Sequence, residues 1–126
     1  MAADADPVRV FKAAWFTKAA RKARISDSEL CEAISEAMKG QADDLGGGVF
    51  KKRLNKNMHR GIILAKGGRR WVYEYLFAKR DRGNIDKDEL DAFRALAKAY
   101  SGLTQRQLSA LLDAKDLTEI CHAYKT

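Results

Sequence analysis

The chain has 126 residues, of which 33% are charged and 46% hydrophobic, with one proline and two cysteines. This composition is typical of one folded domain, residues 1–126, and argues against a disordered or low-complexity chain. No apolar run approaches the length of about 18 residues that spans a membrane, and residues 1–6 lack the basic region and apolar core of a secretory signal. We therefore expect a cytoplasmic protein that has no membrane partner.

The formal net charge of +7 is unevenly distributed. Residues 46–82 contain eleven Lys or Arg and two acids, a net charge of +9, so that the remaining residues carry a net charge of −2. Residues 9–24 add six cations and no acid, whereas residues 25–45 carry six acids and one lysine. A charge concentrated in this way indicates an anionic partner.

The first third of the chain predicts a short strand and two helices. Residues 8–12 are compatible with a strand, and residues 13–24 form a helix by the spacing of their apolar side chains. Ser26 and Glu29 form a capping box, in which we expect the Glu29 side chain to reach back to the cap, and Gly40 can end the second helix. These two helices predict a helical hairpin, followed by a flexible loop over residues 43–48.

Three antiparallel strands are predicted next, over residues 49–55, 58–66 and 69–77, with turns at Lys56-Asn57 and Gly67-Gly68. Alternation places four aromatic residues on one face of the last strand, which we expect to be central because neither of its faces is purely polar. These residues are Trp71, Tyr73, Tyr75 and Phe77.

Two more capped helices complete an α+β protein. Asp86 begins a helix that Gly102 ends, and Thr104 begins a shorter one. Residues 117–124 are compatible with either a closing strand or a last helical turn.

The sequence predicts no nucleotide cofactor, metal or disulfide. The glycines of residues 46–48 lack the order of a dinucleotide-binding loop, and no phosphate-binding loop motif is present. Neither His59 nor His122 has a partner at metal-ligand spacing. Cys31 and Cys121 lie far apart in sequence, and we expect buried, reduced thiols.

Basic side chains recur on the predicted strands and after the last one, where an antiparallel arrangement brings several of them to one end and face of the sheet. Such a surface suits a phosphodiester backbone. The candidate RNA-binding residues are Lys51, Lys52, Arg53, Lys56, Arg69, Arg70 and Arg82, with Tyr73 and Tyr75 as secondary candidates for base stacking. A row of aromatic residues is more often part of a core than a stacking platform.

The same cluster has the groups that RNA cleavage needs. When a 2′-hydroxyl attacks the adjacent phosphate, cations stabilise the growing negative charge, and other groups accept and donate a proton. Arg60, Lys79 and Arg80 are the candidate cations. His59 is the candidate for proton transfer because imidazole exchanges protons near neutral pH. Glu74, a lysine or a tyrosine are its rivals, and His59 is also compatible with a purely structural role in the turn.

The sequence resembles the RelE/ParE superfamily of type II toxin-antitoxin toxins, in particular the RelE branch that includes HigB-like toxins, over roughly residues 8–120. The resemblance rests on four segments: Phe11-Lys12 before Trp15-Phe16, residues 45–53 (LGGGVFKKR), Arg60, and residues 77–85 (FAKRDRGNI) with Asp88-Glu-Leu90 and Leu96-Ala-Lys98 downstream.

The resemblance implies a helical hairpin packed on a curved antiparallel sheet, and a ribosome-dependent mRNA endonuclease that inhibits translation without a metal. It also implies a cognate antitoxin, and binding to operator DNA only as the toxin-antitoxin complex. Its site positions correspond to Lys51, Lys52, Arg53, Arg60, Lys79 and Arg80. This chain has His59-Arg60 where many relatives have Tyr-Arg, and Ile85 where a catalytic tyrosine is expected.

Two other functions remain compatible with the sequence. The ParE branch has the same fold and inhibits DNA gyrase without cleaving RNA. A nucleic-acid-binding regulatory module is the third possibility. Arg60 and the Lys79-Arg80 pair favour the nuclease.

Overall fold

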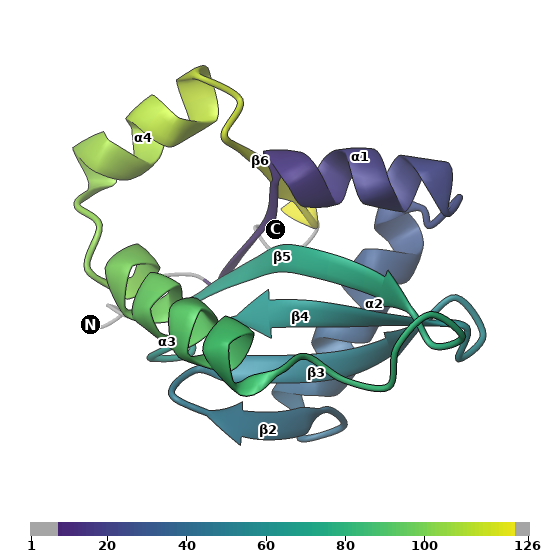
Figure 1. Ribbon diagram of the computed structural model, residues 1–126. Helices are drawn as coiled ribbons and strands as arrows, with labels where there is room; N and C mark the ends of the chain where they lie inside the picture. The colour runs from purple at the N-terminus through teal and green to yellow at the C-terminus, as the bar shows by residue number, and fades with distance from the viewer. Residues whose placement is uncertain (1–7, 123–126) are drawn as a thin grey trace.

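The computed structural model describes residues 8–122, which contain one six-stranded sheet and four helices (Figure 1). In chain order the elements are β1 (Arg9–Ala13), α1 (Ala14–Lys22), α2 (Asp27–Met38), β2 (Asp43–Gly46), β3 (Val49–Leu54), β4 (His59–Leu64), β5 (Arg70–Ala78), α3 (Lys87–Ser101), α4 (Gln105–Asp113) and β6 (Leu117–Ile120). The strand order is β2-β3-β4-β5-β1-β6, and each neighbouring pair is antiparallel except β1 and β5. The expected α+β fold and the central position of β5 are confirmed.

Each face of the sheet packs against helices. On one face, which we call the α1/α2 face, Phe16 of α1 and Leu30 and Ile34 of α2 pack against the strands. On the other, the α3 face, Ala97 of α3 and Leu108 of α4 are buried. Figure 1 shows α2 behind the sheet and α3 in front of it, so that α3 leaves the β3–β4 turn and the end of β5 uncovered. No helix in residues 8–122 is long and apolar enough to cross a membrane.

The helices begin where their capping residues predict. Asp86 and Thr104 both form complete capping boxes, with Glu89 and Gln107 respectively. Ser26 accepts a hydrogen bond from the Glu29 backbone amide as expected, but the Glu29 carboxylate accepts one from the backbone amide of Asn55. That half of the expected capping box was wrong, because a tertiary partner takes the side chain.

The glycine-rich segment is a hairpin, so the expectation of a flexible loop was wrong. Residues 43–46 form β2, which pairs antiparallel with β3. Gly47 has a φ of +67°, and a Cβ at this position would lie 2.6 Å from Cγ of Arg94. The Arg94 guanidinium donates a 2.6 Å hydrogen bond to the carbonyl of Leu45. The turn therefore packs tightly against α3.

The aromatic residues of β5 are divided between the two faces of the sheet, so the prediction of a shared face was wrong. Ile62 pairs with Tyr75, whereas Ile63 pairs with Tyr73, and Glu74 is the extra residue of a bulge. Trp71 and Tyr73 pack on the α1/α2 face, whereas Tyr75 and Phe77 pack on the α3 face. One inserted residue reverses the alternation of every side chain that follows it.

Cys31 of α2 and Cys121 after β6 form a disulfide, which corrects the expectation of two reduced thiols. The sheet explains the pairing. β6 pairs with β1, and Val10 of β1 lies in the same core cluster as Leu30 and Ile34 of α2. The residue that follows β6 is thus brought beside α2 despite a sequence separation of 90 residues. The tail through Ile120 is a strand, and residues 123–126 lie outside the described residues.

Candidate functional site

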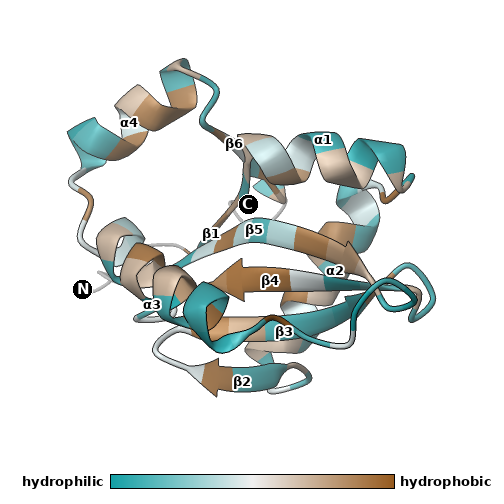
Figure 2. Cartoon of the chain, viewed as in Figure 1, coloured by the Kyte–Doolittle hydropathy of each residue, from teal (hydrophilic) through white to brown (hydrophobic). Residues whose placement is uncertain are grey.

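The pairing of β3, β4 and β5 gathers three cations on the α3 face, at the end of the sheet that α3 itself does not reach. Arg53 pairs with Arg60, which in turn pairs with Phe77, and residues paired in this way lie on the same face. In the next row Lys51 pairs with Ile62, which pairs with Tyr75. We call this surface the basic face; its residues are Lys51, Arg53, Arg60, Tyr75, Phe77 and, from the following loop, Arg82. Figure 2 shows the same end of the sheet as hydrophilic, where β3 ends and β4 begins.

Arg60 is held in place by the β3–β4 turn. Its Nη1 donates to the carbonyls of Asn57 and His59, both at 3.1 Å. Asn55, Lys56 and Asn57 adopt left-handed backbone conformations with φ of 54°, 52° and 71°. Asparagine tolerates this conformation better than most residues do. The turn thus presents its carbonyl groups to the Arg60 guanidinium.

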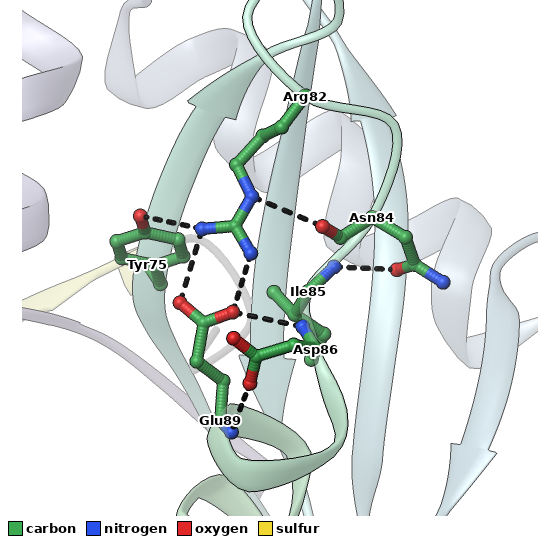
Figure 3. A network of polar contacts seen from close by, with 6 residues as sticks. All are labelled: Tyr75, Arg82, Asn84, Ile85, Asp86 and Glu89. Carbon is green, nitrogen blue, oxygen red and sulfur yellow. Dashed lines mark hydrogen bonds and ion pairs between the residues drawn. The ribbon is translucent and has the colours of Figure 1, made fainter.

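Arg82 forms one wall of the basic face and is fixed by a network of polar contacts (Figure 3). Its guanidinium contacts both carboxylate oxygens of Glu89, donates to the carbonyl of Asn84 at 3.0 Å, and lies 3.4 Å from the hydroxyl of Tyr75. Its Cζ lies 5.6 Å from the centre of the Phe77 ring.

Glu89 also accepts a 2.8 Å hydrogen bond from the backbone amide of Asp86, which is the cap of α3. The hydrogen bond from Arg82, together with this amide, holds the pKa of Glu89 below its ordinary value. The start of α3 and the loop after β5 are therefore joined through one ionised carboxylate.

The other predicted catalytic residues lie around the end of the sheet. His59, Lys79 and Arg80 line a pocket of about 490 Å³ together with Lys56, Asn57, Met58 and Ala78, and we call it the sheet-end pocket. Nδ1 of His59 lies 3.2 Å from Nδ2 of Asn55. Because neighbouring residues of a strand point to opposite faces, His59 and Arg60 approach this end from different sides. Asn57 joins the two sides, since it lines the pocket and its carbonyl holds Arg60.

Besides Lys56, which lines the sheet-end pocket, four of the predicted RNA-binding residues lie away from the basic face. Lys52 points to the α1/α2 face, where its Nζ contacts Glu36 at 2.8 Å and the carbonyl of Gln41 at 2.9 Å. Tyr73 is buried, stacks on Phe16, and donates a 2.7 Å hydrogen bond to the carbonyl of Leu30. Arg69 and Arg70 lie at the opposite end of the sheet, at the start of β5.

Glu74, a rival candidate for proton transfer, is engaged elsewhere. It lies at the bulge of β5 and accepts a 3.0 Å hydrogen bond from the hydroxyl of Tyr100. Burial raises the pKa of Glu74, and this hydrogen bond opposes that shift. Burial and the nearby Glu74 charge also raise the pKa of Tyr100 well above its ordinary value. The pair connects β5 to α3.

Sequence reasoning missed two members of this region, Trp15 and Glu89. Trp15 is 53% exposed and stacks on Tyr75 with ring centres 5.0 Å apart. The apolar spacing of residues 13–24 predicts a helix without indicating that Trp15 stays exposed, whereas the buried residues of α1 are Phe16 and Ala20. Glu89 belongs to the capping box that Asp86 begins, and nothing in its spacing indicated its contact with Arg82. Among residues 8–122 no group of three or more His, Cys, Asp or Glu could hold a metal ion.

Residues 8–120 match the family model described as the RelE toxin of the RelE / RelB toxin-antitoxin system. No curated protein sequence matches the chain. The family match covers nearly the whole chain, and the α+β fold described above agrees with the expectation from the sequence. The chain therefore belongs to the RelE family, and it is a toxin of a toxin-antitoxin system whose partner is an antitoxin.

Proposed function

We propose that this toxin is a metal-independent endonuclease that cleaves mRNA on the ribosome, in the cytoplasm, and so inhibits translation. The observation that carries the proposal is the row formed by Arg53, Arg60 and Phe77 across three adjacent strands. Two guanidinium groups directly opposite each other repel. A phosphate between them relieves the repulsion, and the buried Phe77 ring packs beneath Arg82 beside the row.

The reaction is an attack of the 2′-oxygen on the adjacent phosphorus. A new 2′-O–P bond forms as the P–O5′ bond breaks, which leaves a 2′,3′-cyclic phosphate on one fragment and a 5′-hydroxyl on the other. Arg60 and Arg53 stabilise the charge that develops on the non-bridging oxygens. The 2′-hydroxyl loses a proton and the leaving 5′-oxygen gains one, so a proton-transfer group must lie within reach.

His59 takes part in proton transfer in this proposal, and Lys79 and Arg80 hold the RNA backbone beside it. A phosphate at the boundary between the basic face and the sheet-end pocket is approached by Arg60 from one side and by His59 from the other, because Asn57 joins the two surfaces. Lys51, Lys56 and Arg82 extend the cationic surface along the RNA strand. This arrangement supports a cleavage reaction that uses the charged side chains of the protein and no metal ion.

The antitoxin has to cover this surface in order to neutralise the toxin. An acidic or amphipathic segment suits a surface with this charge. We propose that operator DNA is bound only by the toxin-antitoxin complex.

Inducible expression in a host that lacks the antitoxin tests the cleavage proposal. The wild type, Arg60→Ala and the matched control Arg21→Ala, an exposed arginine of α1, are compared for growth arrest and for new mRNA 5′ ends. We expect new ends inside translated codons with the wild type and with Arg21→Ala, and the loss of both cleavage and toxicity with Arg60→Ala. Growth arrest without new ends would instead support inhibition of a protein target such as gyrase.

A further inference from the structure

Trp15 is the only exposed aromatic side chain in residues 8–122. A single exposed apolar residue is common on protein surfaces, so the surroundings of this ring matter more than its exposure. The indole stacks on the ring of Tyr75, with centres 5.0 Å apart and planes inclined by 24°. Tyr75 thus covers and orients one face of the indole, and the exposed part of the side chain leaves room for a second ring.

The junction of β1 and α1 carries Trp15 to the α3 face. β1 pairs with β5 as far as Tyr73, and the chain then enters α1, which lies beside β5 in Figure 1. Consecutive residues of α1 pack on opposite faces of β5: Phe16 stacks on Tyr73, and Trp15 stacks on Tyr75. Trp15 therefore extends the α3 face beyond the edge of β5.

This ring borders the basic face. Tyr75, on which it stacks, lies two residues along β5 from Phe77, which pairs with Arg60. Residues two apart in a strand are about 7 Å apart, and the ring centres of Tyr75 and Phe77 are separated by 6.1 Å. An RNA strand with one phosphate at Arg60 can thus bring a neighbouring nucleotide to Trp15.

Two lysines follow Trp15 on the same side of α1. Lys18 and Lys22 are three and seven residues further along, a spacing that places side chains on one side of a helix. Both are exposed, and neither forms an ion pair within residues 8–122. They therefore provide charge for a phosphate beside the ring, whereas the charge of Arg82 is already balanced by Glu89.

Few acids accompany this surface. Residues 9–24 contain no Asp or Glu. Asp116 contacts the start of α1 through its backbone carbonyl, which accepts a 3.0 Å hydrogen bond from the amide of Ala14. Asp4 and Asp6 lie outside the described residues, so the contribution of the lysines is a quantity that the salt dependence of binding has to measure.

A ring held by a second ring, with lysines one and two turns further along, suits single-stranded RNA. Every base has a face that can stack on an aromatic side chain, and the backbone beside it meets the cations. An acidic protein segment pairs with the lysines, but its carboxylates offer the indole no ring. We propose that Trp15 stacks on an unpaired base next to the cleavage site, with Lys18 and Lys22 contacting the adjoining phosphates. This positioning role rests on the proposed function, since it concerns the same RNA.

Tryptophan fluorescence tests the stacking directly. The full-length protein is titrated with a short 2′-O-methyl oligouridylate, which cannot undergo 2′-oxygen attack, and with an abasic phosphodiester oligomer of the same length. The second tryptophan, Trp71, is 7% exposed, so we expect quenching of Trp15 by the oligouridylate and none by the abasic oligomer. Trp15→Phe, which leaves Trp71 as the only tryptophan, should show no quenching with either.

Affinity provides the second readout. Trp15→Ala should bind the oligouridylate about tenfold more weakly and the abasic oligomer as tightly as the wild type does, whereas Trp15→Phe should retain most of the affinity. Met38→Ala is the matched control, because it truncates another exposed apolar side chain, on α2 behind the sheet. It should bind as the wild type does.

The lysines are tested by the salt dependence of the same binding. Lys18→Ser should make the dependence shallower by about 0.7 in log units, the contribution of one single-strand phosphate contact. Arg21→Ser removes the same charge from an exposed position on another side of α1 and should leave the dependence unchanged. Equal effects of the two variants would overturn the assignment of Lys18, since they would indicate diffuse attraction.

Three outcomes would overturn the stacking role: no quenching by the oligouridylate, equal quenching by the abasic oligomer, or equal affinity of Trp15→Ala and the wild type for the oligouridylate. A larger loss of affinity for a poly-glutamate peptide than for the RNA would also overturn it and assign the surface to an acidic protein segment. Because these readouts measure binding to an RNA that cannot be cleaved, failure of the cleavage proposal is recorded separately by the Arg60→Ala experiment on mRNA ends.

Discussion

Arg53 on β3 lies directly opposite Arg60 on β4, so two like charges share one face of neighbouring strands. Like charges in this position destabilise a sheet. We therefore expect Arg53→Thr to raise the free energy of unfolding of the isolated toxin by about 0.5 kcal/mol, because it removes the repulsion and adds a β-branched residue. Urea denaturation measures the change.

The same variant is expected to lose RNA cleavage, since Arg53 is one of the two guanidinium groups proposed to hold the phosphate. Arg53→Lys, which keeps the charge, serves as the control and should not gain stability. A decrease in the stability of Arg53→Thr would contradict this account of the pair.

Glu89 is expected to make the stability of the toxin depend on acid pH. Its pKa is lowered in the folded state, chiefly by the hydrogen bond from Arg82 and then by the amide of Asp86. A lowered pKa stabilises the fold above the ordinary pKa of a glutamate, and this stabilisation is lost as the pH falls through the lowered value. The decline in stability on acidification should therefore be smaller in Glu89→Gln than in the wild type, as measured by urea denaturation at a series of pH values.

Asp88→Asn is the matched control for that experiment, because it removes a neighbouring exposed carboxylate for which no ion pair is seen in residues 8–122. The free energy of unfolding of Asp88→Asn should decline on acidification as much as that of the wild type does. Asp91, whose pKa Lys87 lowers, contributes to the decline in all three proteins. Identical curves for Glu89→Gln and the wild type would show that the Arg82 contact does not persist in solution.

The disulfide between Cys31 and Cys121 is expected to stabilise the toxin strongly under oxidising conditions. It closes a loop with a sequence separation of 90 residues, and a cross-link of this kind typically contributes about 2–4 kcal/mol by restricting the unfolded chain. Cys31→Ser/Cys121→Ser should melt at a lower temperature than the oxidised wild type. Dithiothreitol should lower the melting temperature of the wild type to that of the variant and leave the melting temperature of the variant unchanged. If the reductant does not change the melting temperature of the wild type, the prediction is contradicted.

Local sequence signals predicted most of the fold. Caps at Ser26, Asp86 and Thr104 mark helix starts because the side chain and the amide that it satisfies lie three residues apart. The second strand was missed because residues 43–46 (DDLG) have little strand propensity, and pairing with β3 decides their conformation. The bulge at Glu74 has no sequence signature, and the disulfide depends on how β6 and α2 meet in space.

Sequence reasoning likewise predicted part of the candidate site and missed the rest. Alternation along β3 separates Lys51 and Arg53 from Lys52, and strand pairing places Arg60 beside Arg53. The predicted turns at Lys56-Asn57 and Gly67-Gly68 already imply that Arg69 and Arg70 lie at the other end of the sheet from Arg53 and Arg60, and the structure has them there. The aromatic candidates were separated by the bulge, which left Tyr75 near Arg82 and moved Tyr73 into the core.

Tyr73→Phe tests whether Tyr73 stabilises the core and takes no part in the candidate site. The Tyr73 hydroxyl is buried and donates to the carbonyl of Leu30, and the loss of a buried hydrogen bond of this kind costs about 1 kcal/mol. We expect a small decrease in the free energy of unfolding and unchanged RNA cleavage by the folded protein. Tyr75→Ala, on the basic face between Trp15 and Phe77, is the comparison, and we expect it to reduce cleavage. A loss of cleavage in Tyr73→Phe without a loss of stability would return Tyr73 to the site.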